Sequence, residues 1–398
     1  MRPVYDVAII GAGPVGLSFA TALAGSGLSA VLVERQPLSV LEDPSFDGRE
    51  IALTHHSRTL LEQLGAWAHI PQNAVSPLRQ ARVLNGTASY ALTFDTGGKD
   101  EGPLGFLVSN HLIRSALYAA LQGTPDIRLI AGTGVESVTT GAEAATLRLS
   151  DGQEIRARLV VAADTRFSRS RQEQGITASM HDFRRSMLVC RIEHETPHEH
   201  VATEWFDYGQ TVALLPVNGA ASSLVLTRDP AEIERLNGLE PAAFEREMGQ
   251  CLRRRHLGRL RLVSTRHAYP LVATYAHHFA GRRFALLGDA AVGMHPVTAH
   301  GFNLGLRGAE TLAREILSAK RRGQDIASPA VLRRFETAHR LATGPLYAAT
   351  NAIAVLYAQE GLPARLARHA VLRLGGQIAP FRKAVSAMLM DRGAAMGR

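Results

Sequence analysis

The first apolar segment of the chain runs from Val4 to Ile10 and predicts a buried β-strand. Glycines follow it directly, and the residues from Pro14 to about Ala24 predict a helix with proline early in its first turn. A second apolar run, Ala30–Val33, predicts another strand and leads into an acidic residue, Glu34. Strand, helix and strand in this order form a βαβ unit, which is typical of an α/β fold.

The glycines of this unit are spaced as Gly11-x-Gly13-x-x-Gly16. In dinucleotide-binding proteins the first allows the turn, the second lets the backbone approach a pyrophosphate, and the third lets helix and strand pack closely. Glu34 lies 18 residues beyond Gly16, where an acid binds ribose hydroxyls. The predicted site comprises Gly11, Gly13, Pro14, Gly16, Glu34 and Arg35.

A later segment, Phe284–Arg307, changes from a short apolar strand to a loop and then to a helix that opens near Asn303. Gly288 lets the backbone turn closely, and Asp289 offers a carboxylate at the carboxyl end of a strand, where open α/β sheets bind ligands. The loop from Pro296 to Gly301 aims backbone N–H groups at whatever lies before the helix. This segment is a second candidate for nucleotide binding.

Alternating apolar and polar positions dominate the middle of the chain. Residues 127–163 alternate as strands do, with a hairpin turn at Asp151-Gly152, and end at another acid, Asp164. The same alternation predicts four further strands, Met187–Ile192, His200–Trp205, Thr211–Pro216 and Ser222–Leu226. A helix over about Pro241–Leu252 and a strand over Arg261–Ala268 then lead back toward the first domain.

The remainder predicts helices, over Asn303–Leu317, Val331–Ala342 and Pro345–Tyr357, followed by a basic, apolar stretch over residues 362–390. The predicted domains are 1–178 with 266–340 for the nucleotide, 179–265 for a mostly β domain, and 341–398 for a helical C-terminal segment.

Composition excludes several classes of protein. Of 398 residues, 46% are hydrophobic and 20% charged, and no run of 18 or more apolar residues exists to span a membrane. The N-terminus does not read as a signal peptide because Asp6 interrupts its apolar run, so we expect a cytoplasmic protein. Cys190 and Cys251 lack companions at metal spacing, so no metal site is expected.

The net charge of +8 is unevenly distributed. Residues 331–398 hold ten basic and three acidic residues, hence a net +7, and a second basic cluster lies between Arg253 and Arg266. Neither is interleaved with aromatic residues, so nucleic acid is not an expected partner. An arginine-rich genome could explain this bias; the functional alternatives are an anionic membrane surface and a partner protein.

Together, these segments resemble the flavoprotein aromatic hydroxylases, most closely the branch that hydroxylates demethoxyubiquinol-type rings in ubiquinone biosynthesis. Further segments carry the resemblance, namely Asp47-Gly-Arg49-Glu-Ile-Ala-Leu53, Asn110, and Asp164 with Ser168 and Arg171. The resemblance implies a p-hydroxybenzoate-hydroxylase-like fold: a Rossmann-type FAD-binding domain, a mostly β substrate domain and a helical C-terminus. It also implies that reduced FAD takes O2 to a C4a-hydroperoxide, which hydroxylates a polyprenylated phenol, with NAD(P)H or a reductase as reductant.

By the same match, the Gly11–Gly16 turn and Glu34 hold the ADP half of FAD, while Arg49 and Asp289 hold the ribityl-pyrophosphate region. Asn110 and Asp164 contact the cofactor, and the loop after Gly288 lines the isoalloxazine ring. The predicted loop residues are Pro296, Ala299, His300, Gly301, Phe302 and Asn303.

The chain departs from its family at five places. Ser109 replaces a glutamate, Thr165 a glycine, Val292 a histidine, Ala299-His300 a Gly-Gln pair, and Gly308 an aspartate. His300, which titrates near neutrality, could tune protonation of the flavin or substrate and is the candidate catalytic residue. Alternatively, His295 and His300 only hydrogen-bond within a polar loop.

Other functions remain open at this point. A reductase, a halogenase or a hydroxylase of another aromatic compound could share the FAD motifs, although the lysine and the Trp-x-Trp-x-Ile-Pro segment expected of a halogenase are absent. The chain could also be a non-catalytic scaffold in a quinone-biosynthetic assembly. A membrane-resident substrate would favour peripheral contact with the inner face of the membrane, through residues 362–390, or with other quinone-biosynthesis proteins. Alternatively, the apolar residues of this stretch pack against the FAD-binding domain.

Overall fold

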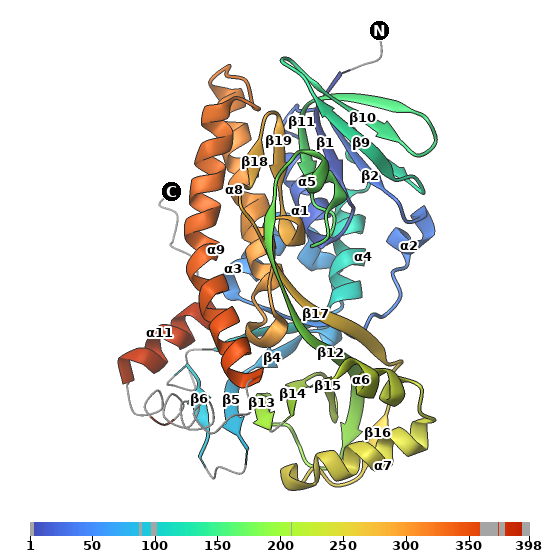
Figure 1. The fold of residues 1–398 in the computed structure, drawn as a ribbon, viewed down its shortest axis with the longest axis vertical. Coiled ribbons are helices and arrows are strands. Elements are labelled where there is room, and N and C mark those ends of the chain that lie inside the picture. Colours follow the sequence, from blue (N-terminus) through green and yellow to red (C-terminus); the bar gives the residue numbers. More distant parts are fainter. Residues whose placement is uncertain are drawn as a thin grey trace.

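The computed structural model describes residues 4–86, 90–96, 102–207, 209–358, 373 and 379–391. Two large sheets lie one above the other, and long strands connect them (Figure 1). The upper sheet contains the predicted βαβ unit, and the lower sheet contains the predicted β domain.

The upper sheet has parallel central strands. Its strands in order are β18 (Ala280–Gly281), β19 (Phe284–Leu286), β11 (Glu154–Ala162), β1 (Val4–Ile10), β2 (Ala30–Glu34) and β8 (Ile127–Ala131), and β10 (Ala145–Leu149) and β9 (Val135–Thr140) extend β11. Ile9 of β1 lies opposite both Val161 and Leu32. Strands covered on both faces carry continuous apolar runs, which is why the sequence revealed them.

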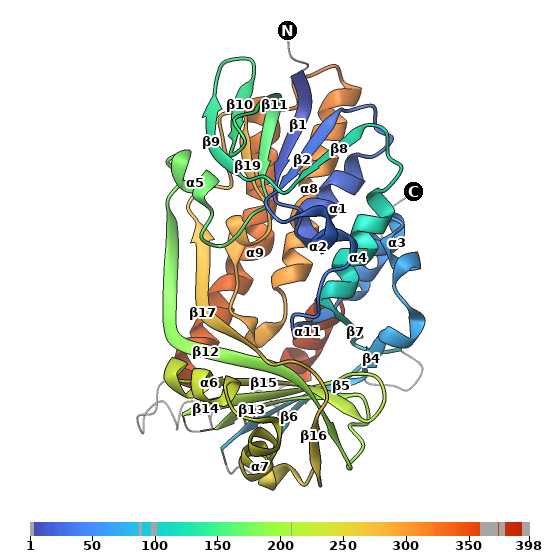
Figure 2. The same cartoon turned by 90° about the vertical axis from the view of Figure 1, so that its right-hand side faces the viewer.

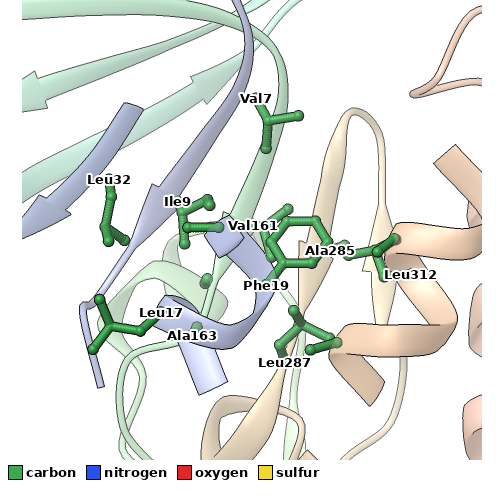
Figure 3. Packing of buried hydrophobic residues seen from close by; sticks show 14 of the residues in the cluster. Val7, Ile9, Leu17, Phe19, Leu32, Val161, Ala163, Ala285, Leu287 and Leu312 are labelled. Carbon is green, nitrogen blue, oxygen red and sulfur yellow. The ribbon is translucent and has the colours of Figure 1, made fainter. Parts of the chain in front are cut away.

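Helices cover this sheet and close the core. They include α1 (Pro14–Leu23), α4 (Asn110–Leu121) and α8 (Gly301–Arg321). Figure 3 shows Phe19 of α1 next to Val161 and Ala285 of the strands, with Leu312 of α8 on the far side of Ala285, and all four side chains are fully buried. This packing fixes the glycine turn after β1 against α8.

The lower sheet has nine strands. Its order is β20 (Val292–Gly293), β17 (His267–Ala276), β12 (Ala178–His194), β15 (Ala221–Arg228), β14 (Gln210–Pro216), β13 (Val201–Asp207), β5 (Gln80–Asn85) and β6 (Leu92–Phe94), with β16 (Leu260–Leu262) also paired to β12. One face packs on α6 (Pro230–Asn237) and α7 (Pro241–Cys251). The other face is turned toward the upper domain, and β12 and β17 run from one sheet to the other (Figure 2).

Two features of this sheet differ from the sequence prediction. β5 and β6 come from the segment 1–178, yet β5 pairs in parallel with β13. The single strand predicted over Arg261–Ala268 is wrong, because β16 and β17 are separate. Between β16 and β17, the Ser264 hydroxyl accepts a hydrogen bond from the Arg191 backbone N–H (2.8 Å), and the strand is interrupted at this point.

Smaller elements join the domains. A three-stranded sheet consists of β3 (Glu50–Leu53), β7 (Gly105–Ser109) and β4 (Ser76–Leu78). Short helices are α2 (Leu38–Glu42), α3 (His55–Gln63) and α5 (Arg169–Glu173), and 3₁₀ turns are η1 (Ala66–His69), η2 (Gln72–Ala74), η4 (Arg253–Arg255), η5 (Gly288–Ala290) and η6 (Pro296–Thr298).

The two predicted helices over 331–357 form one helix, α9 (Pro329–Ala358), with Pro345 inside it. Proline removes a hydrogen bond to the residue four positions earlier, Leu341. Leu341 is 74% exposed, so this turn of the helix lies at the protein surface, and the helix continues past the proline.

The predicted basic stretch over residues 362–390 lies mainly outside the described residues. Its last part forms α11 (Ala379–Met390), whose Val385 and Leu389 pack against Leu92 and Phe94 of β6. No helix within the described ranges has the length and apolarity needed to cross a membrane.

Candidate active site

A cavity of about 850 Å³ lies between the two sheets. One wall consists of the turns at the carboxyl ends of the upper strands, and the opposite wall is the free face of the lower sheet. Of the predicted site residues, the cavity is lined by Gly13, Pro14, Arg35, Arg49, Asn110, Asp164, Gly288, Asp289, Pro296, Ala299, Gly301 and Phe302. Gly11, Gly16, Glu34, His300 and Asn303 do not line it.

The three glycines of the turn have different surroundings. Gly11 has φ +99°, and a Cβ on Gly16 would lie 1.9 Å from the Gly11 carbonyl oxygen, so neither position admits a side chain. A Cβ on Gly13, by contrast, would meet nothing within 4 Å. Gly11 and Gly16 therefore build the turn, and Gly13 leaves open space at the cavity.

Glu34 braces this turn from the end of β2. Its Oε2 accepts from the Ala12 backbone N–H at 2.7 Å, and its Oε1 accepts from that of Gln36 at 2.9 Å. The carboxylate holds the turn in shape, while the neighbouring Arg35 borders the cavity.

Arg49 and Asn110 meet at Asp47. Arg49 Nη2 lies 2.6 Å and Asn110 Nδ2 lies 2.7 Å from Asp47 Oδ2. Burial by itself raises the pKa of Asp47, but Arg49 and Asn110 hold this pKa below its ordinary value. The Arg49 guanidinium lies 5.6 Å from the ring centre of Tyr269, so it is oriented from two sides.

Glu50 lies next to Ser109. Position 109 is the one at which the family usually carries a glutamate. The two residues lie directly opposite each other on β3 and β7, and Ser109 Oγ donates to Glu50 Oε2 at 2.9 Å. Arg191 of β12 donates to Glu50 Oε1 from Nε at 2.8 Å and Nη2 at 2.6 Å. A carboxylate from the neighbouring strand therefore lies beside position 109. The sequence did not indicate the roles of Glu50 and Arg191.

Asp164, at the end of β11, has one unused oxygen. Ser168 Oγ donates to its Oδ2 at 2.9 Å, while Oδ1 is buried without a hydrogen-bond partner among the described residues. Burial raises the pKa of Asp164. The following Thr165 points to the cavity, and buried Arg171 donates to the Ala290 carbonyl at 2.9 Å, which ties this turn to η5.

Asp289 pairs with an arginine that sequence reasoning missed. Arg166 Nη2 lies 2.8 Å from Asp289 Oδ2, and Arg166 Nη1 donates to the Val272 carbonyl at 2.6 Å. Both side chains line the cavity. Arg166 immediately follows Thr165, where the chain departs from the family pattern. Its place next to this departure is the signal in the sequence that could have identified it.

The loop after η5 is fastened by Asn303. Its amide Nδ2 donates to the Ala52 carbonyl at 2.8 Å, and its Oδ1 accepts from the Thr54 N–H at 3.2 Å. Ala299 has φ +53°, which explains why a glycine is usual in the family at this position. Asn303 thus positions the loop from behind and does not reach the cavity.

The two loop histidines differ in position. His295 lines the cavity, packs edge-on to Phe183 with ring centres 4.6 Å apart, and burial lowers its pKa to about 4. His300 is 6% exposed, does not line the cavity, and neither ring nitrogen has a hydrogen-bond partner in the described part of the chain. Burial lowers the pKa of His300 as well.

Gly308 leaves room for another buried histidine. A Cβ on Gly308 would lie 2.8 Å from Cε1 of His339, whose imidazole is 2% exposed and has a pKa lowered to about 4 by burial. The aspartate usual at this position would collide with that ring. The departure at Gly308 is thus compensated by packing between α8 and α9.

The lower wall of the cavity is mostly apolar. Two cross-strand rows face it, Val189–Val225–Ala213–Glu204 and Met187–Thr227–Thr211–Phe206. Glu204 is the one carboxylate on this face among the described residues that line the cavity. Burial raises the pKa of Glu204 to about 8. Sequence reasoning did not identify Glu204.

The site fits a flavin dinucleotide. Gly13 leaves space for a close approach, three arginines (Arg35, Arg49 and Arg166) border the upper wall of the cavity, and Asp164 offers a free buried acceptor. The profile of the FAD binding domain family matches residues 4–343. The chain belongs to this family.

Relatives of this flavoprotein agree with the assignment. It is 46% identical over 388 residues to the ubiquinone hydroxylase UbiM of Neisseria meningitidis, covering 96% of this chain and 84% of that protein. It is 35% identical over 379 residues to the ubiquinone hydroxylase UbiL of Rhodospirillum rubrum, covering 94% and 87%. Among solved structures, p-nitrophenol 4-monooxygenase PnpA of Pseudomonas putida superposes with a TM-score of 0.79 at 18% identity, over 100% of both chains.

These findings confirm the predicted fold class and enzyme class. The flavoprotein is a FAD-dependent monooxygenase with a p-hydroxybenzoate-hydroxylase-like fold. They favour this interpretation over a reductase or a non-catalytic scaffold.

Proposed function

We propose that the flavoprotein hydroxylates the aromatic ring of a polyprenylated phenol, a precursor of ubiquinone. The observation that carries the proposal is one continuous cavity that joins a dinucleotide cradle to an apolar sheet face. The names of the two relatives support ubiquinone precursors as the substrate class.

In this proposal FAD lies along the upper wall. The Gly11–Gly16 turn, Pro14, Glu34 and Arg35 hold its ADP half, and Arg49, Asn110, Asp164, Gly288 and Asp289 hold the ribityl-pyrophosphate region. The loop with Pro296, Ala299, Gly301 and Phe302 lines the flavin ring, and Asn303 and His300 support that loop. When bound, FAD supplies the activation of O2 and the transfer of one oxygen atom.

The protein's own contribution is placement and exclusion of water. Val189, Val225 and Ala213 offer the substrate ring an apolar floor opposite the flavin loop. His295 is neutral near pH 7 because its pKa is about 4, so it adds no charge beside the reacting ring. An apolar, enclosed site keeps water from the reaction.

The reductant in this proposal is NAD(P)H. The described residues contain one glycine-rich βαβ unit, so the nicotinamide would have to reach the flavin through the cavity beside Thr165 and Arg166. Anaerobic mixing of the purified protein with NADH or NADPH tests this, since bleaching of the flavin absorbance reports reduction directly.

Access to the substrate involves the membrane surface in this proposal. The net +7 charge over residues 331–398 supports attraction to an anionic bilayer, and Met388 of α11 is 41% exposed. Val385 and Leu389, by contrast, pack on β6 and are not available for such contact. Sedimentation with anionic liposomes at low and high salt tests the idea, and failure to co-sediment at low salt contradicts it.

Quinone analysis of a strain lacking the protein tests the proposed function. We expect the strain to accumulate a prenylated ring that lacks one hydroxyl group, and the wild-type gene to restore ubiquinone. A Gly13→Val variant, designed to exclude FAD, is the matched negative control. Unchanged quinone content in the deletion strain would contradict the proposal.

A further inference from the structure

Glu204 is an isolated carboxyl group on a mostly apolar surface. It lies on β13 beside Ala213 of β14 and Val83 of β5. The two residues beyond Ala213 in the same row are Val225 and Val189. On the other side Val83 packs with Val385 and Leu389 of α11. No element packed around Glu204 presents it with an arginine or lysine at pairing distance in the described structure.

The position of the side chain explains its state. Glu204 borders the cavity and is partly exposed to it, while the surrounding protein shields its carboxyl group from bulk water, and this desolvation is the sole cause of its raised pKa. Shielding a carboxyl group from water without a hydrogen-bond partner costs free energy. A ligand in the cavity would provide the missing hydrogen bond.

The surroundings restrict what that ligand group can be. A cation would require several ligands, and the described residues contain no group of three or more His, Cys, Asp or Glu side chains that could hold a metal ion. The neighbouring apolar rows instead fit an aromatic ring and its hydrocarbon substituents. A hydroxyl group on such a ring can donate to the carboxylate form of Glu204 and accept from the neutral form.

Resting on the proposed function, we propose that Glu204 binds the ring hydroxyl of the substrate and takes its proton. The O–H bond of the phenol breaks, an O–H bond forms on the Glu204 carboxylate, and the negative charge passes to the phenol oxygen. No oxidant or reductant takes part in this step. The phenolate is richer in electrons than the phenol, which favours attack of its ring on an electrophilic oxygen.

Proton acceptance requires the deprotonated carboxyl group. With a pKa of about 8, Glu204 is mainly protonated at pH 7 and mainly deprotonated at pH 9. The other charged or titratable side chains near this end of the cavity are Arg185 on β12, His295 in the loop, and Tyr90 in the cluster around Val83. His295 has a pKa of about 4, so it stays neutral between pH 6 and 9.

The first experiment is a binding cycle on the FAD-loaded, oxidised, full-length protein, so that no turnover occurs. Two probes are used, 2-geranylphenol and geranylbenzene, which differ only in the hydroxyl group. A hydrogen bond to a charged group corresponds to roughly a 10- to 150-fold preference for the phenol at pH 9. Glu204→Leu should remove this preference by weakening phenol binding while leaving geranylbenzene binding intact.

Two further variants separate recognition from folding. Glu204→Gln keeps the size and a hydrogen-bonding group, and should retain part of the preference. Glu193→Leu is the matched control, because Glu193 is a glutamate of the same sheet that pairs with Arg261 on the surface, away from the cavity. It should bind both probes as the wild type does.

The pH profile of product formation is the second measurement. Turnover of the wild type should rise between pH 7 and 9 as Glu204 loses its proton, and Glu204→Gln should be slower and flat over this range. Equal discrimination between the probes in wild type and Glu204→Leu overturns the proposal, as does lack of phenol binding by the wild type. If binding follows expectation but the wild type forms no product, the proposed function fails and Glu204 remains a phenol-binding residue.

Discussion

The two walls of the cavity differ in where their side chains come from and in how their charged groups are paired. On the upper wall, charged side chains come from turns and most have a partner, as in Arg49 with Asp47 and Arg166 with Asp289, while Asp164 keeps one oxygen free. On the lower wall, side chains come from the alternating face of a sheet, and Glu204 has no partner among the described residues.

This difference matches what each wall has to recognise. The upper wall faces a cofactor with fixed charges, so the charged side chains of this wall can be held in position by neighbouring residues before the cofactor binds. The lower wall faces a largely apolar ring, so a mostly apolar surface with a single carboxyl group is sufficient. Changes on the upper wall should therefore affect FAD binding, and changes on the lower wall should affect substrate binding alone.

The largest expected effect is at the glycine turn. Gly16→Val would place a Cβ 1.9 Å from the Gly11 carbonyl, so we expect misfolding or a loss of more than about 3 kcal/mol of stability. Gly13→Val has open space, so it should stay folded but colourless. Melting temperature and flavin absorbance distinguish the two. A yellow Gly13→Val protein with stoichiometric FAD would remove the turn from the cofactor site.

Next in size is a change on the lower wall. Ala213→Phe adds a ring that projects into the cavity between Val225 and Glu204, where the substrate ring should lie. We expect at least a roughly tenfold loss of 2-geranylphenol affinity, corresponding to 1.4 kcal/mol, with FAD affinity unchanged. Ala213→Ser, which adds a single oxygen, is the control. Parallel loss of FAD would show that the two walls are not independent.

An effect of similar size is expected for Asp289→Ala on the upper wall. Removing a carboxylate that binds ribityl hydroxyls costs about 1–3 kcal/mol, roughly a five- to 150-fold loss of FAD affinity. Asp325→Ala is the matched control because Asp325 also pairs with arginines, Arg158 and Arg283, but away from the cavity. Equal FAD dissociation constants for Asp289→Ala and wild type would place Asp289 outside the cofactor site.

The same contrast explains what the sequence could predict. Gly13, Glu34 and Asp164 follow contiguous strands, and the spacing of a local motif fixes their position in space. Glu204 stands between Thr203 and Trp205, and periodicity alone does not decide which face of the strand meets the cavity. Trp205 turned out to pack on the α7 side and Glu204 on the cavity side.

Other features that the sequence did not predict depend on contacts between distant segments. Pairing of β5 with β13 joins residues about 120 positions apart, and no local pattern encodes it. The carboxylate of Glu50 lies beside position 109, where the family has one, because the two residues are cross-strand neighbours. The continuation of α9 through Pro345 was not predicted because a proline in a helix interior usually ends or kinks the helix.

The smallest expected effect concerns the predicted catalytic residue His300. Its ring is buried behind the flavin loop and does not line the cavity, so it can influence either wall only through the backbone of that loop. From this position we expect His300→Gln, the usual family residue, to retain FAD and to change turnover by no more than about twofold. The pH profile between 5.5 and 8.5 should also keep its shape.

His295→Gln is the informative comparison, because the His295 side chain does line the cavity and accepts a hydrogen bond from the Val297 N–H at 3.2 Å. It should weaken 2-geranylphenol binding more than His300→Gln does. A displaced pH profile in His300→Gln with unchanged FAD content would instead support a catalytic role for His300. It would also show that a residue buried behind the flavin loop affects the reaction at the substrate ring.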